Sequence, residues 1–411
     1  MSQNMLNFLK ASLLMFVISM MLIEIALRVS PKIIPPHLLI HFHPVPRKEA
    51  AMGRFQLKED TVLLQRDDNG PPLRLVKPNK TLQWKNMDGN GRKHSVVTDE
   101  VGFCNKRGVY QASSSFDIVT IGDSFTWCLA VDQEQTWTSN LANHTALSAY
   151  NLGKTGVGLY EYIQILKSYG LKKDPRYVVL SVYGGNDLRD AYKYDVYKHN
   201  TNVETPKENK LLLNTVEYLA EKSYVVSLIQ SLFLVDFIVP PNKISRSEVD
   251  FRYKLLFKDS ELSFNGENTD KDEVIFAKKL LNDEISLDLF NDALKEFVNL
   301  SEQHDFIPII VYIPSAHVAY KKHVVFNDQE IKNIMFEFDS LQRKYFAQMA
   351  NEVGYVYNDL SSTLQDRAEK LGVDDLLYYR RNLHLSVLGH KEVAKAVSTT
   401  IEKHSFVNSN D

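Results

Sequence analysis

The stretch FDIVTIGDSFTWC, residues 116–128, is the part of the sequence that best indicates the fold. Its β-branched residues at 117–121 predict a buried strand, and a helical pattern begins soon after the Gly-Asp-Ser that follows. A tight turn from strand to helix exposes the side chain that it carries and brings a backbone N–H near a helix start. Ser124 is therefore either a nucleophile presented at a strand end or an ordinary polar turn residue, since Gly, Asp and Ser are all common in turns.

The same alternation of strand and helix runs through the rest of the chain. Helical patterns such as LYEYIQILKSYGL separate short runs that are rich in β-branched and aromatic residues, namely 149–152, 177–183 and 308–313. Apolar strands joined by helices predict a parallel sheet that is covered on both faces. The expected fold class is therefore α/β, a doubly wound domain.

Composition limits the possible partners. The chain has 411 residues, of which 44% are apolar and 24% charged, as expected for a folded globular protein. A net charge of -3 offers no basic surface for nucleic acid, so this class of partner is excluded. The two cysteines, Cys104 and Cys128, can form one bridge in an oxidising compartment. The favoured interpretation of Cys128 is nevertheless a small buried apolar residue behind the Ser124 turn.

The N-terminus predicts a membrane anchor. ASLLMFVISMMLIEIAL (11–27) is apolar on nearly every face, and Phe8 and Leu9 extend it toward the roughly 20 residues that cross a bilayer. No convincing small-residue cleavage site follows, which favours an uncleaved single-pass signal anchor over residues 1–28. Basic residues stand on both sides of the run, so the positive-inside rule leaves the orientation open. We expect the folded domain to lie outside the cytoplasm.

Three regions are expected along the chain. Residues 29–113 form a proline- and histidine-rich tether followed by turn-rich strands or loops. The α/β domain covers 114–405 and is interrupted at about 195–285 by a segment without the strand–helix alternation. The apolar run at 224–239 in this insertion contains Gln230 and fits a lid helix better than a second membrane span. Insertions at the mouth of an α/β site usually shape substrate access.

Three further motifs lie at predicted strand ends or before a predicted helix, where open parallel sheets bind ligands. GKTG (153–156) either brings backbone N–H groups close to a ligand or is a simple glycine turn. In GGND (184–187), Asn186 either offers its side-chain amide to an oxyanion or caps the next helix. RRNLHLSVLGH places His384 before the last helix as a candidate base, and His390 is interpreted as structural.

IGDS (121–124), GKTG, GGND and NLHLSVLGH (382–390) occur in the order of the four signature blocks of SGNH, or GDSL-type, hydrolases. VTDEVGFCNK, FTWCLAVDQEQTW and VYIPS also look like the membrane-anchored bacterial members of that family. Each block is loose alone, but four blocks in order, each at a strand end, are more specific. The resemblance covers about residues 95–200 and 290–403 and implies a flavodoxin-like SGNH-hydrolase fold with three α/β/α layers.

Carried over position by position, the resemblance implies the chemistry of a serine esterase. Ser124 attacks an ester carbonyl, and His384 takes the hydroxyl proton as general base. The oxyanion is held by the backbone N–H groups of Ser124 and Gly156 and by the side chain of Asn186. No metal or organic cofactor is implied, and the sequence shows no metal-ligand spacing of histidines or cysteines.

The sequence departs from the family at the third member of the triad. Similar members carry Asp two or three residues before the catalytic His, where this chain has Asn382 and Arg381. An Asn side-chain oxygen can fix the imidazole tautomer but cannot offset the imidazolium charge. Activity is then expected to be weak, to run as a Ser-His dyad, or to use a nearby acid such as Asp374 or Asp375.

Three functions compete at this stage. The favoured function is hydrolysis of an acyl or acetyl ester of a small molecule or polysaccharide, by a protein that binds the membrane through its N-terminal helix. The first alternative is an O-acyltransferase that modifies a cell-envelope polysaccharide, because it would use the same serine and oxyanion donors. The second is a non-catalytic SGNH-fold binding or assembly protein, which Asn382 favours.

Overall fold

Contacts divide the chain into two compact units, and the computed structural model describes residues 3–34, 38, 42, 46, 50, 61–64, 73–85, 93–199, 218–238, 249–258, 260–265 and 268–407. The helical unit is formed by Met1–Leu75 with Lys193–Lys243. The sheet unit is formed by Val76–Tyr192 with Ile244–Asp411. The insertion expected at 195–285 is thus shared between the units, because its first half groups with the N-terminal segment.

The sheet unit is built on one parallel sheet of five strands, in the spatial order β12-β10-β7-β5-β6. Their bounds are β5 Ile118–Ile121, β6 Ala149–Asn151, β7 Tyr177–Tyr183, β10 Ile307–Ile313 and β12 Val356–Asp359. Numbered along the chain, this order is 2-1-3-4-5, which is the flavodoxin-like order. The predicted α/β class and the parallel, flavodoxin-like sheet are therefore confirmed.

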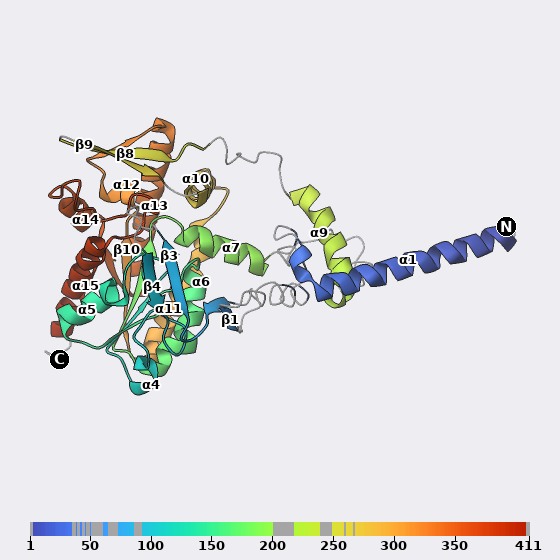
Figure 1. Ribbon diagram of the computed structural model, residues 1–411, viewed down its shortest axis with the longest axis horizontal. Helices are drawn as coiled ribbons and strands as arrows, with labels where there is room; N and C mark the ends of the chain where they lie inside the picture. Colours follow the sequence, from blue (N-terminus) through green and yellow to red (C-terminus); the bar gives the residue numbers. More distant parts are fainter. Residues whose placement is uncertain are drawn as a thin grey trace. The chain divides into compact units, whose positions relative to one another are not determined.

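Helices cover both faces of this sheet (Figure 1). Right-handed crossovers place α5, which links β5 to β6, on one face and α6, α11 and α13, which lead toward β12, on the other. The last helix, α15, packs beside α5. The helices of these layers are α5 Trp137–Thr145, α6 Leu159–Ile165, α11 Asn291–His304, α13 Gln329–Val353, α14 Ser361–Ala368 and α15 Val387–Val407.

Burial explains which strands the sequence predicts well. All seven residues of β7 (YVVLSVY) are buried, as expected for a central strand covered on both faces. The edge strand β12 (VYND) is only half-buried along its length, so it lacks the continuous apolar run and was not predicted. The boundaries predicted for the other four strands agree with the structure within one residue.

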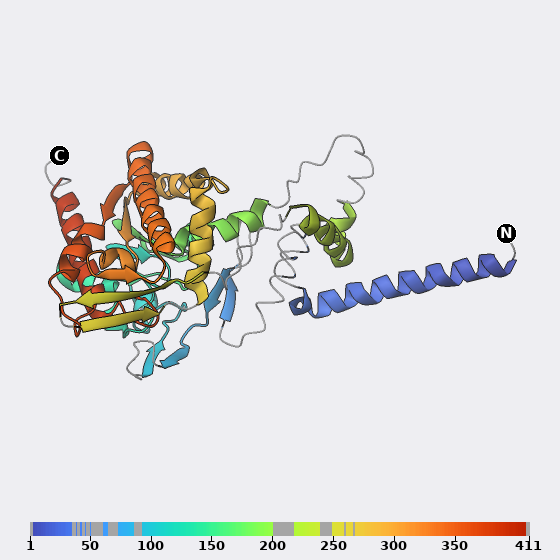
Figure 2. The ribbon, with the colours of Figure 1, turned by 90° about the horizontal axis from the view of Figure 1, so that it is seen from above.

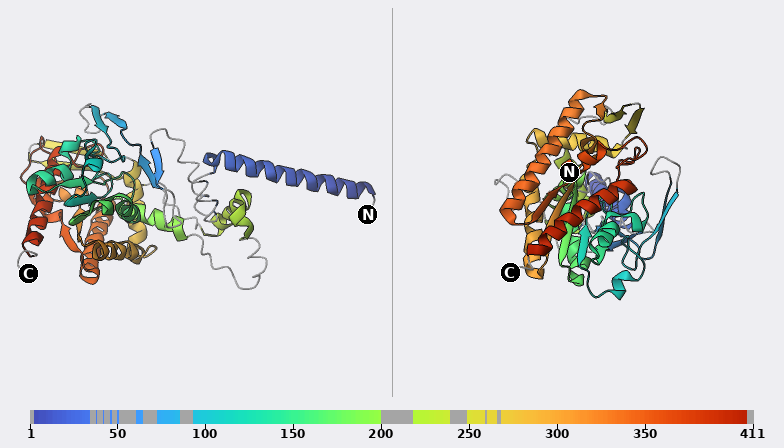
Figure 3. Two further views of the ribbon diagram at one scale, coloured as in Figure 1. Left: turned by 90° about the horizontal axis from the view of Figure 1, so that it is seen from below. Right: turned by 90° about the vertical axis from the view of Figure 1, so that its left-hand side faces the viewer.

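Smaller elements surround the sheet. The second half of the expected insertion supplies β8, β9 and the helix α10, and β8 and β9 form an antiparallel sheet with the later strand β11, in the order β11-β8-β9. A separate ribbon pairs β3 with β4 (Figure 3). The bounds are β3 Thr81–Lys85, β4 Lys93–Val97, β8 Arg252–Phe257, β9 Ser260–Asn265, β11 Val324–Phe326, α4 Val109–Ala112, α7 Asp187–His199, α10 Asn268–Leu281 and α12 Ala316–Ala319. Short 3-10 or π turns are η2 Gln133–Gln135, η3 Leu166–Gly170, η4 Leu171–Lys173 and η7 Leu287–Phe290.

The helical unit begins with one long apolar helix, α1 Gln3–Val29, which Figure 2 shows as a single extended rod. Its segment Met5–Val29 is long and apolar enough to cross a membrane, and in its most apolar 18 residues only 6% is buried. The unit also holds η1 Pro31–Ile33, the paired strands β1 Thr61–Leu64 and β2 Leu73–Val76, and the helix α9 Tyr224–Ile238. Most of the tether expected after residue 34 lies outside the described residues.

The edge strand β6 is closed by the segment that precedes the sheet. The side chain of Asn105 donates to the backbone oxygen of Asn151 at 3.0 Å and accepts from its N–H at 2.9 Å, as a neighbouring strand would. Asp99 holds this segment in place by accepting from three backbone N–H groups, from Asn105 and from the Tyr150 hydroxyl. The segment DEVGFCN (99–105), called the edge segment below, therefore takes the place of a neighbouring strand at this edge of the sheet.

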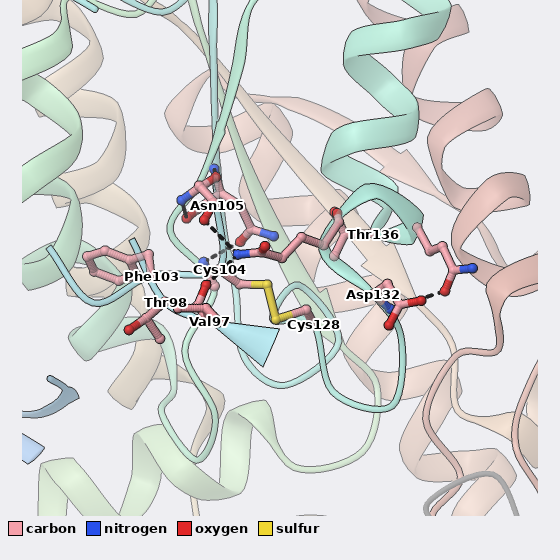
Figure 4. Close-up of a disulfide and its surroundings, with 12 residues drawn as sticks. Val97, Thr98, Phe103, Cys104, Asn105, Cys128, Asp132 and Thr136 are labelled. Atoms are coloured by element: carbon pink, nitrogen blue, oxygen red, sulfur yellow. Dashed lines mark hydrogen bonds between the residues drawn. A yellow bond between two sulfur atoms is a disulfide. The ribbon is translucent and has the colours of Figure 1, made fainter. Parts of the chain in front are cut away.

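A disulfide joins the edge segment to the chain that follows the Ser124 turn. Cys104 is bonded to Cys128, and Gln133 donates to the backbone oxygens of Val97 and Asn105 beside it (Figure 4). Cys128 is buried, as the favoured interpretation expected, but it forms the bridge to Cys104 that the sequence had left open. The spacing of the two cysteines along the chain could not reveal that the edge segment folds back toward the Ser124 turn.

We expect the disulfide to stabilise the sheet unit by about 3 kcal/mol, because it closes a loop across 24 positions of the unfolded chain. Urea unfolding of the oxidised protein should show a higher midpoint than unfolding in the presence of a reductant. The Cys104→Ser/Cys128→Ser double variant is the control, since its midpoint should not respond to reductant. Equal midpoints for oxidised and reduced protein would contradict the prediction.

Candidate active site

Ser124 lies in a tight turn directly after β5. Gly122 makes this turn possible, because a Cβ at that position would collide with the hydroxyls of Ser181 and Thr126, which bond to each other at 2.5 Å. The buried Asp123 accepts from the backbone N–H of Phe125 at 2.8 Å and so closes the turn. Ser124 itself is partly exposed at the end of the strand, as the sequence predicts.

The structure brings His384 to Ser124 across 260 residues of chain. The Nε2 atom of His384 lies 2.7 Å from the Oγ of Ser124, which is hydrogen-bond distance for a nucleophile and its base. The Ser124 hydroxyl has a second, longer contact of 3.2 Å to the carboxylate of Asp123. The shorter contact directs the hydroxyl proton toward the imidazole.

The other side of the imidazole is oriented by a backbone carbonyl. Nδ1 of His384 lies 2.8 Å from the main-chain oxygen of Asn382. Leu383 between them has φ = 58°, a left-handed conformation that costs a non-glycine residue about 1–2 kcal/mol and here turns the imidazole back toward that oxygen. Hydrogen bonding at Nδ1 leaves Nε2 as the acceptor for the Ser124 hydroxyl.

The role expected for the Asn382 side chain is therefore taken by its backbone. The side-chain oxygen of Asn382 accepts from the backbone N–H of His384 at 3.1 Å and does not reach the ring. Asp374 and Asp375, the other acids considered, line a separate cavity of about 480 Å³ together with Tyr379 and Arg380. The group that contacts Nδ1 of His384 is therefore the backbone carbonyl of Asn382.

Aromatic rings enclose the base. The Phe125 ring stacks on His384 at a centroid distance of 4.7 Å and on Tyr183 at 3.6 Å. Burial lowers the pKa of His384 from 6.5 to about 4, while its bond to the Asn382 carbonyl opposes this shift. The imidazole is thus neutral, and able to accept a proton, at neutral pH.

The predicted oxyanion donors line the same pocket as Ser124 and His384, a cavity of about 250 Å³. Gly156 has φ = 70°, and a Cβ there would meet no atom, so glycine is required by the backbone conformation and not by space. Asn186 comes from the turn between β7 and α7, and its Nδ2 donates to Asp190 at 2.9 Å. All sequence-predicted site residues therefore meet at one edge of the sheet.

Sequence reasoning missed three charged residues of this pocket: Arg189, Asp190 and Glu273. Arg189 and Glu273 are buried, and the guanidinium of Arg189 lies 3.3 Å from the Asp190 carboxylate. Nearby Asp190 and Glu273 raise the pKa of Arg189 although burial opposes this. Asp190 in the first turn of α7 follows Asn186 by four residues, a spacing that could have indicated their contact. Glu273 lies in the insertion, where no motif pointed to it.

His390, interpreted as structural from the sequence, lies away from the pocket lining. Its Nδ1 accepts from the backbone N–H of Trp137 at 3.1 Å, which satisfies a free donor in the first turn of α5. Burial lowers its pKa to about 3, so the ring is neutral and can accept this bond. His390 therefore joins α15 to α5 behind the site.

Comparison with known proteins finds similarity only among solved structures. No family model and no curated protein matches the sequence. A lipolytic protein of the G-D-S-L family from Desulfitobacterium hafniense, described as putative, is 16% identical with a TM-score of 0.35 and covers 69% of this chain and 97% of its own. An acetyl xylan esterase is 13% identical with a TM-score of 0.35 and covers 69% and 98%.

A third solved structure, an acetylxylan esterase from Geobacillus stearothermophilus, is 12% identical with a TM-score of 0.34 and covers 69% of this chain and 93% of its own. TM-scores of this size do not support an argument about function. The parallel sheet with strand order 2-1-3-4-5 is the observation that identifies the fold.

The backbone orientation of His384 predicts that Asn382→Asp changes the kcat/KM for a small acetyl ester by less than about tenfold, because the carbonyl still orients the ring. If a side chain were the missing triad member, the gain could approach the roughly 10⁴-fold that separates Asp from Asn in a serine protease. A rate gain above a hundredfold in the variant would contradict the backbone role.

In the unaltered protein, kcat/KM should decrease as the pH is lowered, with a midpoint below pH 6.5. The reason is that the lowered pKa keeps the His384 imidazole neutral to lower pH.

Proposed function

We propose that this protein is a serine esterase that hydrolyses short acyl esters of polar alcohols by a Ser-His dyad. The observation that carries the proposal is the 2.7 Å contact between Ser124 Oγ and His384 Nε2 inside a pocket that Gly156 and Asn186 also line. Nucleophile, base and candidate oxyanion donors are the minimum set for acyl transfer.

The reaction follows from these positions. Ser124 Oγ forms a bond to the ester carbonyl carbon while its proton passes to Nε2 of His384. The tetrahedral intermediate collapses, the bond to the alcohol breaks, and the imidazolium returns the proton to the departing alkoxide. A water molecule then repeats the sequence on the acyl-enzyme, which releases the carboxylic acid and restores the serine.

Stabilisation of the oxyanion is assigned to the backbone N–H groups of Ser124 and Gly156 and to the Asn186 amide. The amide can donate only if its Nδ2 is turned toward the pocket. Asp190 supports this orientation, because its carboxylate accepts one of the two Nδ2 hydrogens at 2.9 Å. We assign Asp190 as a positioning residue for Asn186.

The pocket also limits the substrate. A cavity of about 250 Å³ suits an acetyl or similarly short acyl group better than a fatty acyl chain. Arg189, Asp190 and Glu273 bring charged groups to its lining, where they can exchange hydrogen bonds with the hydroxyls of a sugar or other polyol. An acetylated polysaccharide or small polyol is therefore the proposed substrate class.

Transfer of the acyl group to a sugar acceptor is the second candidate function, because the polar lining can hold an acceptor hydroxyl as well as a leaving alcohol. Single-turnover acylation of Ser124, followed by partition of the acyl group between water and a sugar, separates the two. Esterase activity requires that most of the acyl-enzyme is lost to water.

The catalytic domain is proposed to work outside the cytoplasm, held to the membrane by α1. Disulfides persist in oxidising compartments, so the bond between Cys104 and Cys128 supports this location. The apolar surface of α1 supports membrane attachment.

We expect a fluorophosphonate probe to label the full-length protein at Ser124, because the probe reacts with a serine that a neighbouring base activates. Peptide mapping by mass spectrometry identifies the labelled residue. Ser124→Ala and His384→Ala should both abolish labelling, and Ser139→Ala is the control for an ordinary hydroxyl. An unlabelled Ser124 in folded protein would favour the non-catalytic, binding alternative.

The positioning role of Asp190 predicts that Asp190→Ala lowers kcat by about tenfold to hundredfold, with little change in KM, since an oxyanion donor is misplaced and not removed. Asp190→Asn should keep most of the activity, because its side-chain oxygen still accepts from Asn186. The loss in Asp190→Ala should not add to the loss in Asn186→Ala. Fully additive losses would show that Asp190 acts independently of Asn186.

A further inference from the structure

Glu24 is the one acidic residue in the apolar run of α1, and its carboxylate caps the start of another helix. Its carboxylate accepts from the Ser223 hydroxyl at 2.9 Å and from the backbone N–H groups of Tyr224 and Val225 at 3.1 and 2.9 Å. These groups belong to the start of α9, where N–H donors have no partner within the helix. The anchor helix therefore holds the N-terminus of α9.

Arg28 makes a second connection between the two helices. It pairs with Glu24 at 2.6 Å, one turn earlier on α1, and donates to the backbone oxygen of Lys222 at 2.6 Å. Its guanidinium also lies 4.6 Å from the centre of the Tyr224 ring. The junction thus joins charge, backbone and aromatic groups from both helices.

Apolar packing continues from this junction. Leu27 of α1 forms a buried cluster with Tyr224 and Val225 of α9, and the partly buried Met20 of α1 and Leu228 of α9 pack against it. Figure 1 shows α9 crossing α1 steeply near the C-terminal end of α1, where the two helices are in contact. α9 is therefore fixed against the last turns of the anchor and runs across it.

Two further apolar side chains among the described ones of α9 are exposed. Ile229 is 39% exposed and Leu232 is 49% exposed, so neither faces the junction. The hydroxyls of Ser227 and Ser231 donate within the segment, to the backbone oxygens of Ala220 and Ser227. Hydroxyls satisfied in this way do not need water, as is required of a segment that lies in lipid.

The lengths of α9 and α1 indicate how each helix can lie in a bilayer. The 15 residues of α9 span about 22 Å, which is too short to cross a hydrocarbon core of about 30 Å. α1 has 27 residues, about 40 Å, and can cross it. If α1 crosses the bilayer, Glu24 and Arg28 near its C-terminal end lie at the boundary between acyl chains and headgroups. A helix that crosses α1 there lies in the plane of the membrane.

We infer that α9 is a membrane-embedded helix, which lies at the lipid interface beside the end of α1 and contacts acyl chains through Ile229 and Leu232. The occupant of its exposed surface is lipid, because that surface is continuous with the bare apolar surface of α1. The sequence-based expectation of a lid helix is replaced by a second attachment to the bilayer. This inference rests on the proposed anchor and not on the proposed esterase activity.

Spin labels in the full-length protein test the inference. Both native cysteines are bonded to each other, so an introduced cysteine is the single free thiol. Ile229→Cys and Leu232→Cys, each with a nitroxide label, are reconstituted in vesicles of phosphatidylethanolamine and phosphatidylglycerol. Collision with oxygen, which prefers lipid, is compared with collision with a water-soluble nickel chelate. Phe16→Cys on α1 is the lipid reference and Leu256→Cys on β8, 45% exposed, is the water reference.

The expected result is a higher oxygen than nickel accessibility at both α9 positions, as at Phe16→Cys, and the reverse at Leu256→Cys. Nickel accessibility at the level of Leu256→Cys would place α9 in water, and low accessibility to both reagents would place it under protein as a lid. Either result overturns the inference. If Phe16→Cys itself is in water, the anchor proposal fails as well.

Glu24→Ala is the matched variant, because it removes the cap while leaving the apolar surface of both helices unchanged. In this background the Leu232→Cys label should lose most of its preference for oxygen, whereas the Phe16→Cys label should keep it. An unchanged Leu232→Cys label would show that α9 does not depend on Glu24 for its place at the membrane.

Discussion

The hydrogen-bonded pair formed by the Asn105 side chain and the backbone of Asn151 is the constraint on which the active-site edge depends. β6 is an edge strand, and its free backbone groups would otherwise be open to water or to another chain. The side chain of Asn151 continues the connection, since it donates to the backbone oxygen of Thr126 and accepts from the N–H of Gly153. One buried network therefore fixes the turn after β5 and the turn after β6.

The Ser124 turn and the GKTG turn are thus set by a segment that contributes nothing to the pocket itself. The disulfide from Cys104 to Cys128 adds a covalent connection along the same path. The orientation of the His384 ring is set differently, because a backbone carbonyl and the left-handed Leu383 hold it. At the sheet edge the Asn105 side chain takes the place of a neighbouring backbone, whereas at His384 a backbone carbonyl takes the place of a side chain.

The insertion connects the pocket with the anchor through the chain. Asn186 and Arg189 precede it, Glu273 follows the described part of α9, and between them the chain passes through the helix that Glu24 caps. The chain therefore leaves the sheet unit after α7, passes through the helical unit and returns to the sheet unit before Glu273.

Sequence by itself was sufficient for the α/β class, four of the five sheet strands, the apolar N-terminal helix and the residues that meet around Ser124, because these depend on local periodicity and on motifs at strand ends. It missed β12, because the half-buried sequence VYND has no continuous apolar run, and it left the bridge between Cys104 and Cys128 open, because a disulfide depends on where a distant loop folds. Only the tertiary structure decided that Asn382 orients His384 with its backbone and that Glu24 caps α9. Both contacts depend on the directions of backbone groups, which residue identity does not specify.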